Sequence, residues 1–132
     1  MIAANELRIG NWVEYDEFGI CRIESINRDS ALLAHGLFDT LIPNDLINPI
    51  AITPEILESN GFIQVKNDIL PYWQIVCNGE DAVIEWHDDN SILVGRKNEC
   101  DKAFNSNYPI QYIHQLQNLY FALTGEELHI KL

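Results

Sequence analysis

The segment from Tyr112 to Leu128 constrains the fold of this 132-residue chain more than any other part. Apolar and aromatic residues share an arc of roughly 120° on a helical wheel: Tyr112, Ile113, Leu116, Leu119, Tyr120 and Leu123. Polar residues occupy the opposite side: His114, Gln115, Gln117 and Asn118. Gly125 is the residue type best able to adopt the left-handed conformation that ends a helix. We therefore predict an amphipathic helix that packs one face against a core, followed by a strand over residues 127–132, where polar and apolar residues alternate.

Phe121 departs from this pattern because it lies at about 180° on the wheel, next to His114 and Gln117. An aromatic side chain on a polar helix face is either covered by a neighbouring loop or belongs to a surface that binds a partner. Both interpretations stay open from the sequence. On the second, His114, Gln117 and Phe121 are the candidates for partner binding.

Residues 7–50 have the pattern of short strands separated by turns. The predicted strands are 7–15, 20–26, 31–35 and 37–42, with turns at 16–19, at 27–30 and at Gly36. Pro43 and Pro49 end the segment, because proline cannot donate to an internal ladder. Four strands in so short a stretch predict a bent sheet or a small SH3-like β-barrel.

The second half begins with a helix signal at Thr53-Pro54-Glu55, which places a hydroxyl at the N-cap, proline at the first helical position and a carboxylate in the first turn. After Phe62 we predict an antiparallel meander of three or four strands, with a hairpin at Asn78-Gly79. A polar loop over residues 96–109 precedes the long C-terminal helix.

The predicted fold class is therefore α+β. An SH3-like β unit over residues 1–50 is followed by an α+β unit over residues 51–132, with helix, antiparallel strands, C-terminal helix and final strand. We expect the long helix to pack on the sheet and the two units to form one compact body.

Charge restricts the kinds of partner. The chain has 20 acidic and 8 basic residues, a net charge of −12. Its densest basic cluster is Arg96-Lys97 with Lys102, so binding to nucleic acid or to an anionic membrane is disfavoured. No apolar run approaches the ~18 residues that span a bilayer, and the N-terminus lacks a signal peptide pattern. Together with three widely spaced cysteines, Cys21, Cys77 and Cys100, read as reduced thiols, this predicts a cytoplasmic protein.

No motif for catalysis or for cofactor binding is present: GxSxG, the P-loop and GxGxxG are all missing. We predict no catalytic residues and no cofactor. Glu85, His87 and Asp89 are the strongest candidates for a metal site, because residues two apart on a strand share a face. The competing interpretation is an ordinary solvated turn, since His-Asp-Asn composition is typical of turns.

Several segments together resemble a family of small uncharacterised proteins from Bacteroides-group bacteria, often found among phage-like or mobile-element genes. They are Leu7-Arg-Ile-Gly-Asn-Trp-Val13, residues 52–62, Tyr72-Trp73 and the motif YIHQLQNLYFALTGEEL over residues 112–128. The N-terminal pattern also resembles the SH3-like start of YopX-type phage proteins. The resemblance implies a phage-like context, and it brings no established activity and no catalytic residues that could be carried over to this chain.

The leading hypothesis from the sequence is a non-enzymatic, phage-derived accessory protein that binds another protein. A homodimer is one form that this contact could take. Two alternatives stay open. One is a metal-binding protein or enzyme centred on Glu85, His87 and Asp89, and the other is an acidic inhibitor that imitates DNA phosphates.

Overall fold

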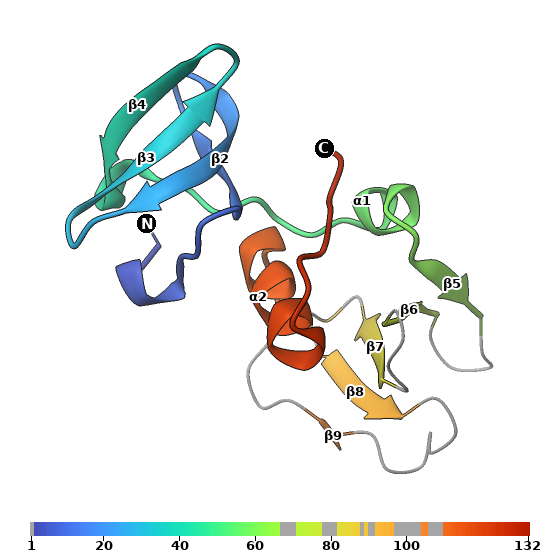
Figure 1. The fold of residues 1–132 in the computed structure, drawn as a ribbon. Coiled ribbons are helices and arrows are strands. Elements are labelled where there is room, and N and C mark those ends of the chain that lie inside the picture. Colours follow the sequence, from blue (N-terminus) through green and yellow to red (C-terminus); the bar gives the residue numbers. More distant parts are fainter. Residues whose placement is uncertain are drawn as a thin grey trace. The chain divides into compact units, whose positions relative to one another are not determined.

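A computed structural model describes residues 2–66, 71–77, 82–87, 89, 92–96, 104–105 and 110–132 (Figure 1). The fold is α+β, as predicted, with two antiparallel sheets. The chain divides into two units. The first contains residues 1–51 and 112–118, and the second contains residues 52–111 and 119–132.

The first unit is built on a four-stranded antiparallel sheet in the order β1-β2-β3-β4. Its strands are β1 (Trp12–Tyr15), β2 (Gly19–Ile26), β3 (Ser30–His35) and β4 (Phe38–Pro43), flanked by the 3-10 turns η1 (Ala4–Glu6) and η2 (Asn44–Leu46). Four strands form, as predicted between residues 7 and 50, but the first begins at Trp12 and not at the predicted Leu7.

This sheet is open, so of the two predicted forms, a bent sheet or a small barrel, the closed barrel does not form. Closure would require β1 to pair with β4, but the outer edge of β1 is taken by Asn48. The backbone N–H groups of Glu14 and Asn48 each donate to the carbonyl of the other residue, both at 2.8 Å. The SH3-like character of the unit stays a prediction.

Alternation along the strands fills the core of the first unit. Residues two apart on a strand point to the same face, and the inward positions are apolar. The buried cluster comprises Ile2, Leu7, Val13, Cys21, Ile23, Ala31, Leu33, Ile42 and Ile47. The apolar residues that alternate with polar ones along these strands therefore lie together on one buried face of the sheet.

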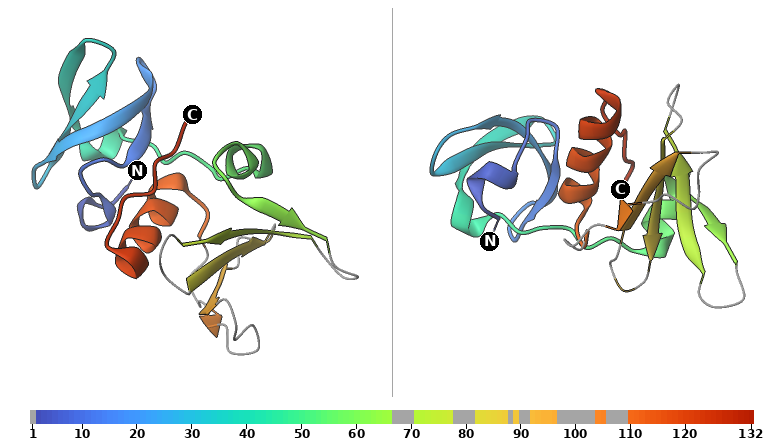
Figure 2. Two further views of the ribbon diagram at one scale, coloured as in Figure 1. Left: turned by 45° about the vertical axis from the view of Figure 1, so that its right-hand side comes forward. Right: turned by 90° about the horizontal axis from the view of Figure 1, so that it is seen from below.

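The second unit contains a five-stranded antiparallel sheet in chain order, one strand more than the largest meander predicted. In Figure 2 its green-to-orange strands lie side by side. They are β5 (Ile63–Val65), β6 (Tyr72–Val76), β7 (Ala82–His87), β8 (Ile92–Arg96) and β9 (Phe104–Asn105). The predicted pairing of β6 with β7 is confirmed, with Trp73 opposite Trp86. The Asn78-Gly79 turn lies outside the described residues.

Helix α1 (Pro54–Ser59) begins as the sequence predicts. The Ile56 N–H donates to the Thr53 hydroxyl oxygen at 3.2 Å. At the other end, the Phe62 N–H donates to the Leu57 carbonyl at 3.0 Å, and both side chains are buried. This hydrogen bond and the apolar pair are those of a Schellman ending.

Helix α2 (Ile113–Thr124) also ends as predicted. Gly125 has a φ of 73°, and its N–H donates to the Phe121 carbonyl at 2.8 Å. No helix in the described part of the chain is long and apolar enough to cross a membrane. Packing of α2 on the sheet stays a prediction.

The final strand predicted over residues 127–132 does not form. A strand needs a neighbouring backbone, but among the described residues the backbone of Lys131 is hydrogen-bonded to the side chain of Asn60. The Lys131 N–H donates to Asn60 Oδ1 at 2.7 Å, and Asn60 Nδ2 donates to the Lys131 carbonyl at 3.1 Å. The alternation itself is retained, because Leu128 and Ile130 are buried.

Candidate functional site

The metal candidates lie at the end of β7. Glu85 and His87 share a face, as the period of the strand requires, with 3.9 Å between Glu85 Oε2 and His87 Nε2. The Tyr72 ring lies beside the imidazole, with 5.3 Å between the ring centroids. Asp89 is in an exposed turn, and no group of three His, Cys, Asp or Glu residues among those described could hold a metal ion. The pair therefore offers two ligands, where a structural zinc site uses four.

Cys21 and Cys77 are buried, and neither forms a disulfide with another described residue. Burial raises the pKa of the Cys21 thiol, which keeps it protonated and weakly nucleophilic. Cys100 lies outside the described residues. The burial of Cys21 and Cys77 indicates that both side chains pack in the interior of the protein.

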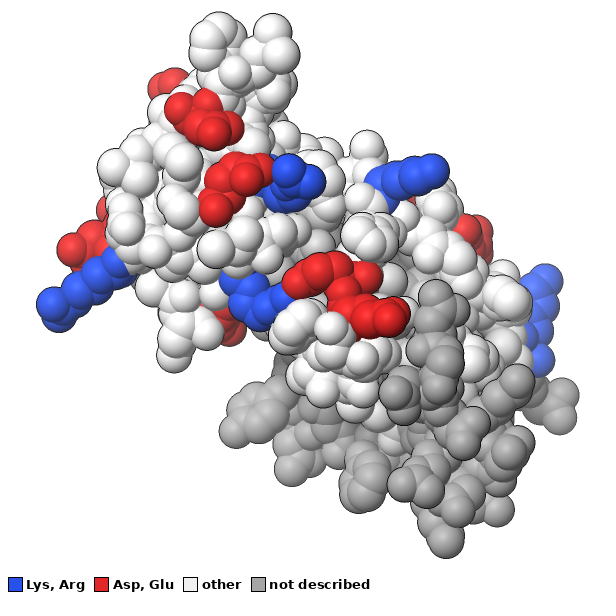
Figure 3. Space-filling view, in the orientation of Figure 1, with Lys and Arg blue, Asp and Glu red and all other residues white. Residues whose placement is uncertain are grey.

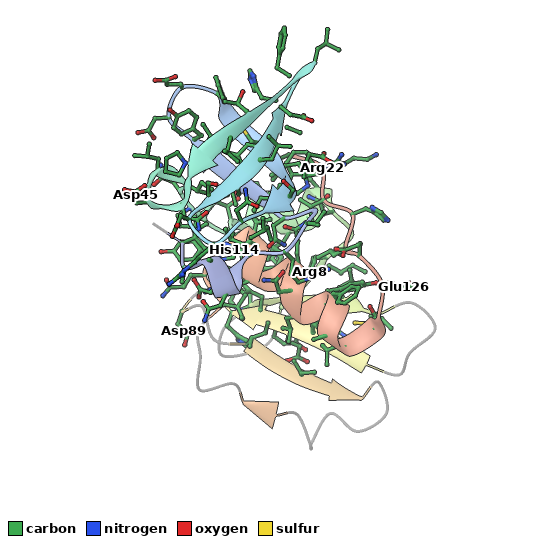
Figure 4. All side chains as sticks on the ribbon, turned by 60° about the vertical axis from the view of Figure 1, so that its left-hand side comes forward. Arg8, Arg22, Asp45, Asp89, His114 and Glu126 are labelled. Carbon is green, nitrogen blue, oxygen red and sulfur yellow. The ribbon has the colours of Figure 1, made fainter. Side chains whose placement is uncertain are left out.

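The second unit has an open groove with a volume of about 560 Å³. It is lined by Ile75, Val76, Tyr120, Glu126, Glu127, Leu128 and His129. The exposed Glu126 carboxylate is labelled in Figure 4.

The polar side of α2 is where the structure differs most from expectation. We expected His114 and Gln117 opposite the buried face, but their exposed fractions are 1% and 2%. Phe121 is 40% exposed. The first turns of α2 are therefore buried on more than the predicted apolar arc. Whether any of the three residues contacts a partner stays a prediction.

Gln117 is buried because it satisfies the backbone at the start of β1. Its Oε1 accepts the Trp12 N–H at 2.9 Å, and its Nε2 donates to the Gly10 carbonyl at 3.2 Å. The Trp12 N–H and the Gly10 carbonyl each need a hydrogen-bond partner once they leave water, and the Gln117 amide provides it. The sequence distinguishes poorly between such an amide and a solvated one, since both are glutamine on a polar helix face.

Asn11 extends this network within the first unit and is fully buried. It accepts the Arg8 N–H at 2.7 Å and donates to Asn118 Oδ1 at 3.0 Å. The Arg8 guanidinium donates to the same Asn118 oxygen at 3.0 Å, and Asn118 Nδ2 donates to the Glu6 carbonyl at 2.7 Å. We call Asn11, Gln117 and Asn118 the amide network; it joins the N-terminal segment to the first turns of α2.

His114 lies on the first turn of α2 and is labelled with Arg8 in Figure 4. Neither imidazole nitrogen has a hydrogen-bond partner among the described residues, and the Tyr112 ring stacks on it at 6.0 Å. Burial lowers the pKa of His114 below its ordinary value of 6.5, and the Glu6 carboxylate partly opposes that shift. The imidazole is therefore neutral at pH 7.

The two most exposed apolar side chains of the first unit, Leu37 and Phe38, are at the β3–β4 hairpin. Leu37 is 97% exposed, Phe38 is 74% exposed and Leu41 is 55% exposed. The protruding end of this hairpin is white in Figure 3, without acidic or basic atoms on the face that is seen. We name Leu37, Phe38 and Leu41 the hairpin patch. The sequence predicts only a strand over residues 37–42. The signal that could have indicated this patch is the apolar residue Leu37 directly after His35-Gly36.

We compared the chain with known protein families, with curated proteins and with solved structures, and none of the three comparisons found a match. The resemblance to the phage-like Bacteroides-group family therefore stays a prediction.

Replacing Gln117 with Leu should destabilise the protein strongly. The substitution leaves the Trp12 N–H and the Gly10 carbonyl without their partner. Both groups are partly buried, so the cost of about 1–3 kcal/mol for a fully buried unsatisfied group is the upper bound for each. Chemical denaturation should show a lower free energy of unfolding. Gln64→Leu, at an exposed position of β5, is the matched control and should change it by less than about 0.5 kcal/mol. Equal effects of the two substitutions would contradict the role assigned to Gln117.

Acidification should destabilise the protein through His114. Because the pKa is lower in the folded state than in the unfolded state, the unfolded chain takes up the proton first as the pH falls. The stability is fully present above about pH 6.5 and decreases below it, toward the lower pKa of the folded state. Melting temperatures between pH 7.5 and 5 measure this decrease.

The matched variants are His114→Phe and His129→Gln, the second at an exposed position. His114→Phe should reduce the loss of melting temperature on the acid side, while His129→Gln should leave it unchanged. A slope that persists in full in His114→Phe would show that other groups cause it.

Proposed function

We propose that this chain is a non-enzymatic accessory protein, phage-derived as its resemblance suggests, that binds another protein through the hairpin patch. The observation that carries the proposal is the pair of adjacent residues Leu37 and Phe38, 97% and 74% exposed at the end of a hairpin. Contiguous exposed apolar side chains on a protein of this kind are typical of interaction sites.

The energetics support a protein partner. Burying a leucine or phenylalanine side chain contributes about 1.5–3 kcal/mol each. Two such residues therefore provide about 3–6 kcal/mol, equivalent to roughly two to four powers of ten in affinity before association costs are subtracted. An apolar patch on a chain of net charge −12 suits a partner surface with an apolar centre and basic surroundings.

Phe121 remains a second candidate for contact. It is 40% exposed and belongs to the second unit, so it can be tested separately from the hairpin patch. The enzymatic and metal alternatives have less support, because Glu85 and His87 form a pair without a third ligand among the described residues.

The test is the double variant Leu37→Ser with Phe38→Ser in the full chain. Proteins that co-purify with the wild-type chain from its native cells are identified, and their binding is then measured with purified components. The double variant should bind at least tenfold more weakly and keep its melting temperature, because neither side chain is in the core.

Ile63→Ser is the control, since Ile63 is 70% exposed on β5 of the second unit. Phe121→Ser tests the second candidate. Unchanged binding by the double variant would contradict the proposal. Loss of binding in Phe121→Ser alone would move the contact to α2.

A further inference from the structure

We infer that the partner's contact includes strand addition: β4 accepts an extended segment, with alternating apolar and basic residues, as a fifth strand of the first sheet. This inference rests on the proposed function and specifies its partner chemistry. In this binding mode the main-chain hydrogen bonds provide affinity, and alternate side chains provide specificity.

The arrangement of sheet edges singles out β4. Among the described strands, the edges are β1, β4, β5 and β9. The β1 edge is paired with Asn48, while β5 has three residues and β9 has two. β4 has six residues and no strand on its outer side. Proteins usually keep unpaired edges short or covered, so a long open edge beside exposed apolar residues indicates a pairing surface.

The register shows which backbone groups face outward. His35 pairs with Phe38 across the two-residue turn Gly36-Leu37, which makes it the first hydrogen-bonded pair of the hairpin. Hydrogen-bonded and non-hydrogen-bonded pairs then alternate along the strands, so Asp39 and Leu41 direct their N–H and C=O groups away from β3.

Pro43 occupies the next outward position, opposite Ser30. Proline lacks an N–H, and it is tolerated in a sheet only where that group would not join the ladder. Its presence is consistent with this register. The open edge therefore offers two donors, from Asp39 and Leu41, and three acceptors, from the same residues and Pro43.

The side chains of β4 specify the incoming segment. Asp39 and Leu41 are both exposed and lie on one face of the strand, while Phe38 is exposed on the other. An added strand would place side chains directly opposite these positions. A lysine or arginine opposite Asp39 and apolar residues opposite Leu41 and Phe38 are complementary.

The net charge of the chain favours a different protein, and not a second copy of this chain, as the occupant of the β4 edge. Two copies would each bring a net charge of −12 to the interface, and like charges raise the cost of association. A basic segment instead gains from the same field. We therefore commit to a basic, apolar segment of another protein as the occupant of the β4 edge.

The probe is a displayed library of random ten-residue peptides, selected on the full chain. We expect enriched peptides to alternate apolar and polar residues, with lysine or arginine at a fixed spacing. Leu41→Pro removes one outward donor and leaves the β3–β4 ladder in place, so it should weaken these peptides at least tenfold. Leu41→Ala keeps the donor and should weaken them less.

Amide exchange in the wild-type chain provides a measurement that does not depend on a proline variant folding. A selected peptide should slow exchange at Asp39 and Leu41 and leave Thr40 unchanged, since the Thr40 N–H already faces β3. No enriched alternating peptide, or enriched peptides that leave Asp39 and Leu41 unprotected, would overturn strand addition.

Two further results separate this inference from the proposed function. If binding of the native partner is lost in the Leu37/Phe38 double variant but retained in Leu41→Pro, the hairpin patch binds a folded surface, and only strand addition fails. If sedimentation shows a wild-type dimer that Leu41→Pro dissociates, the occupant is a second copy and the inference is wrong.

Discussion

The hydrogen bonds from Gln117 to the backbone of Gly10 and Trp12 are the interaction on which the first unit depends. β1 begins at Trp12, and the turn before it exposes backbone groups that no strand satisfies. A buried backbone group without a partner costs about as much as a lost hydrogen bond. A glutamine from a distant part of the sequence removes that cost, and the rest of the amide network fixes its geometry.

The two edge strands of the first sheet differ in whether their outward backbone groups are hydrogen-bonded. Asn48 covers β1 with reciprocal backbone hydrogen bonds, whereas β4 is left with outward groups at Asp39 and Leu41. An open edge normally favours unwanted pairing. If β4 accepts a strand, the acidic side chain of Asp39 and the missing donor of Pro43 would restrict that pairing to complementary segments.

Local signals in the sequence predicted most of the secondary structure because their causes are local. The Thr53 cap, the Gly125 stop and the alternation within residues 7–50 each depend on neighbours a few positions away. The open sheet, the buried Gln117 and the missing last strand depend on pairing between distant segments. Asn48 against β1 and Asn60 against Lys131 are examples, and periodicity cannot reveal either.

The candidate site was harder to predict than the fold for a related reason. From the sequence, titratable groups such as Glu85 and His87 were the strongest site candidates, because catalysis and metal binding use recognisable residue types. A contact surface has no such types: Leu37 and Phe38 differ from core residues only in exposure, which is a property of the folded chain. Leu37 lies in the two-residue turn and Phe38 begins β4, so the β3–β4 ladder fixes the backbone next to both side chains. Binding would therefore cost this chain mainly the freedom of the two side chains.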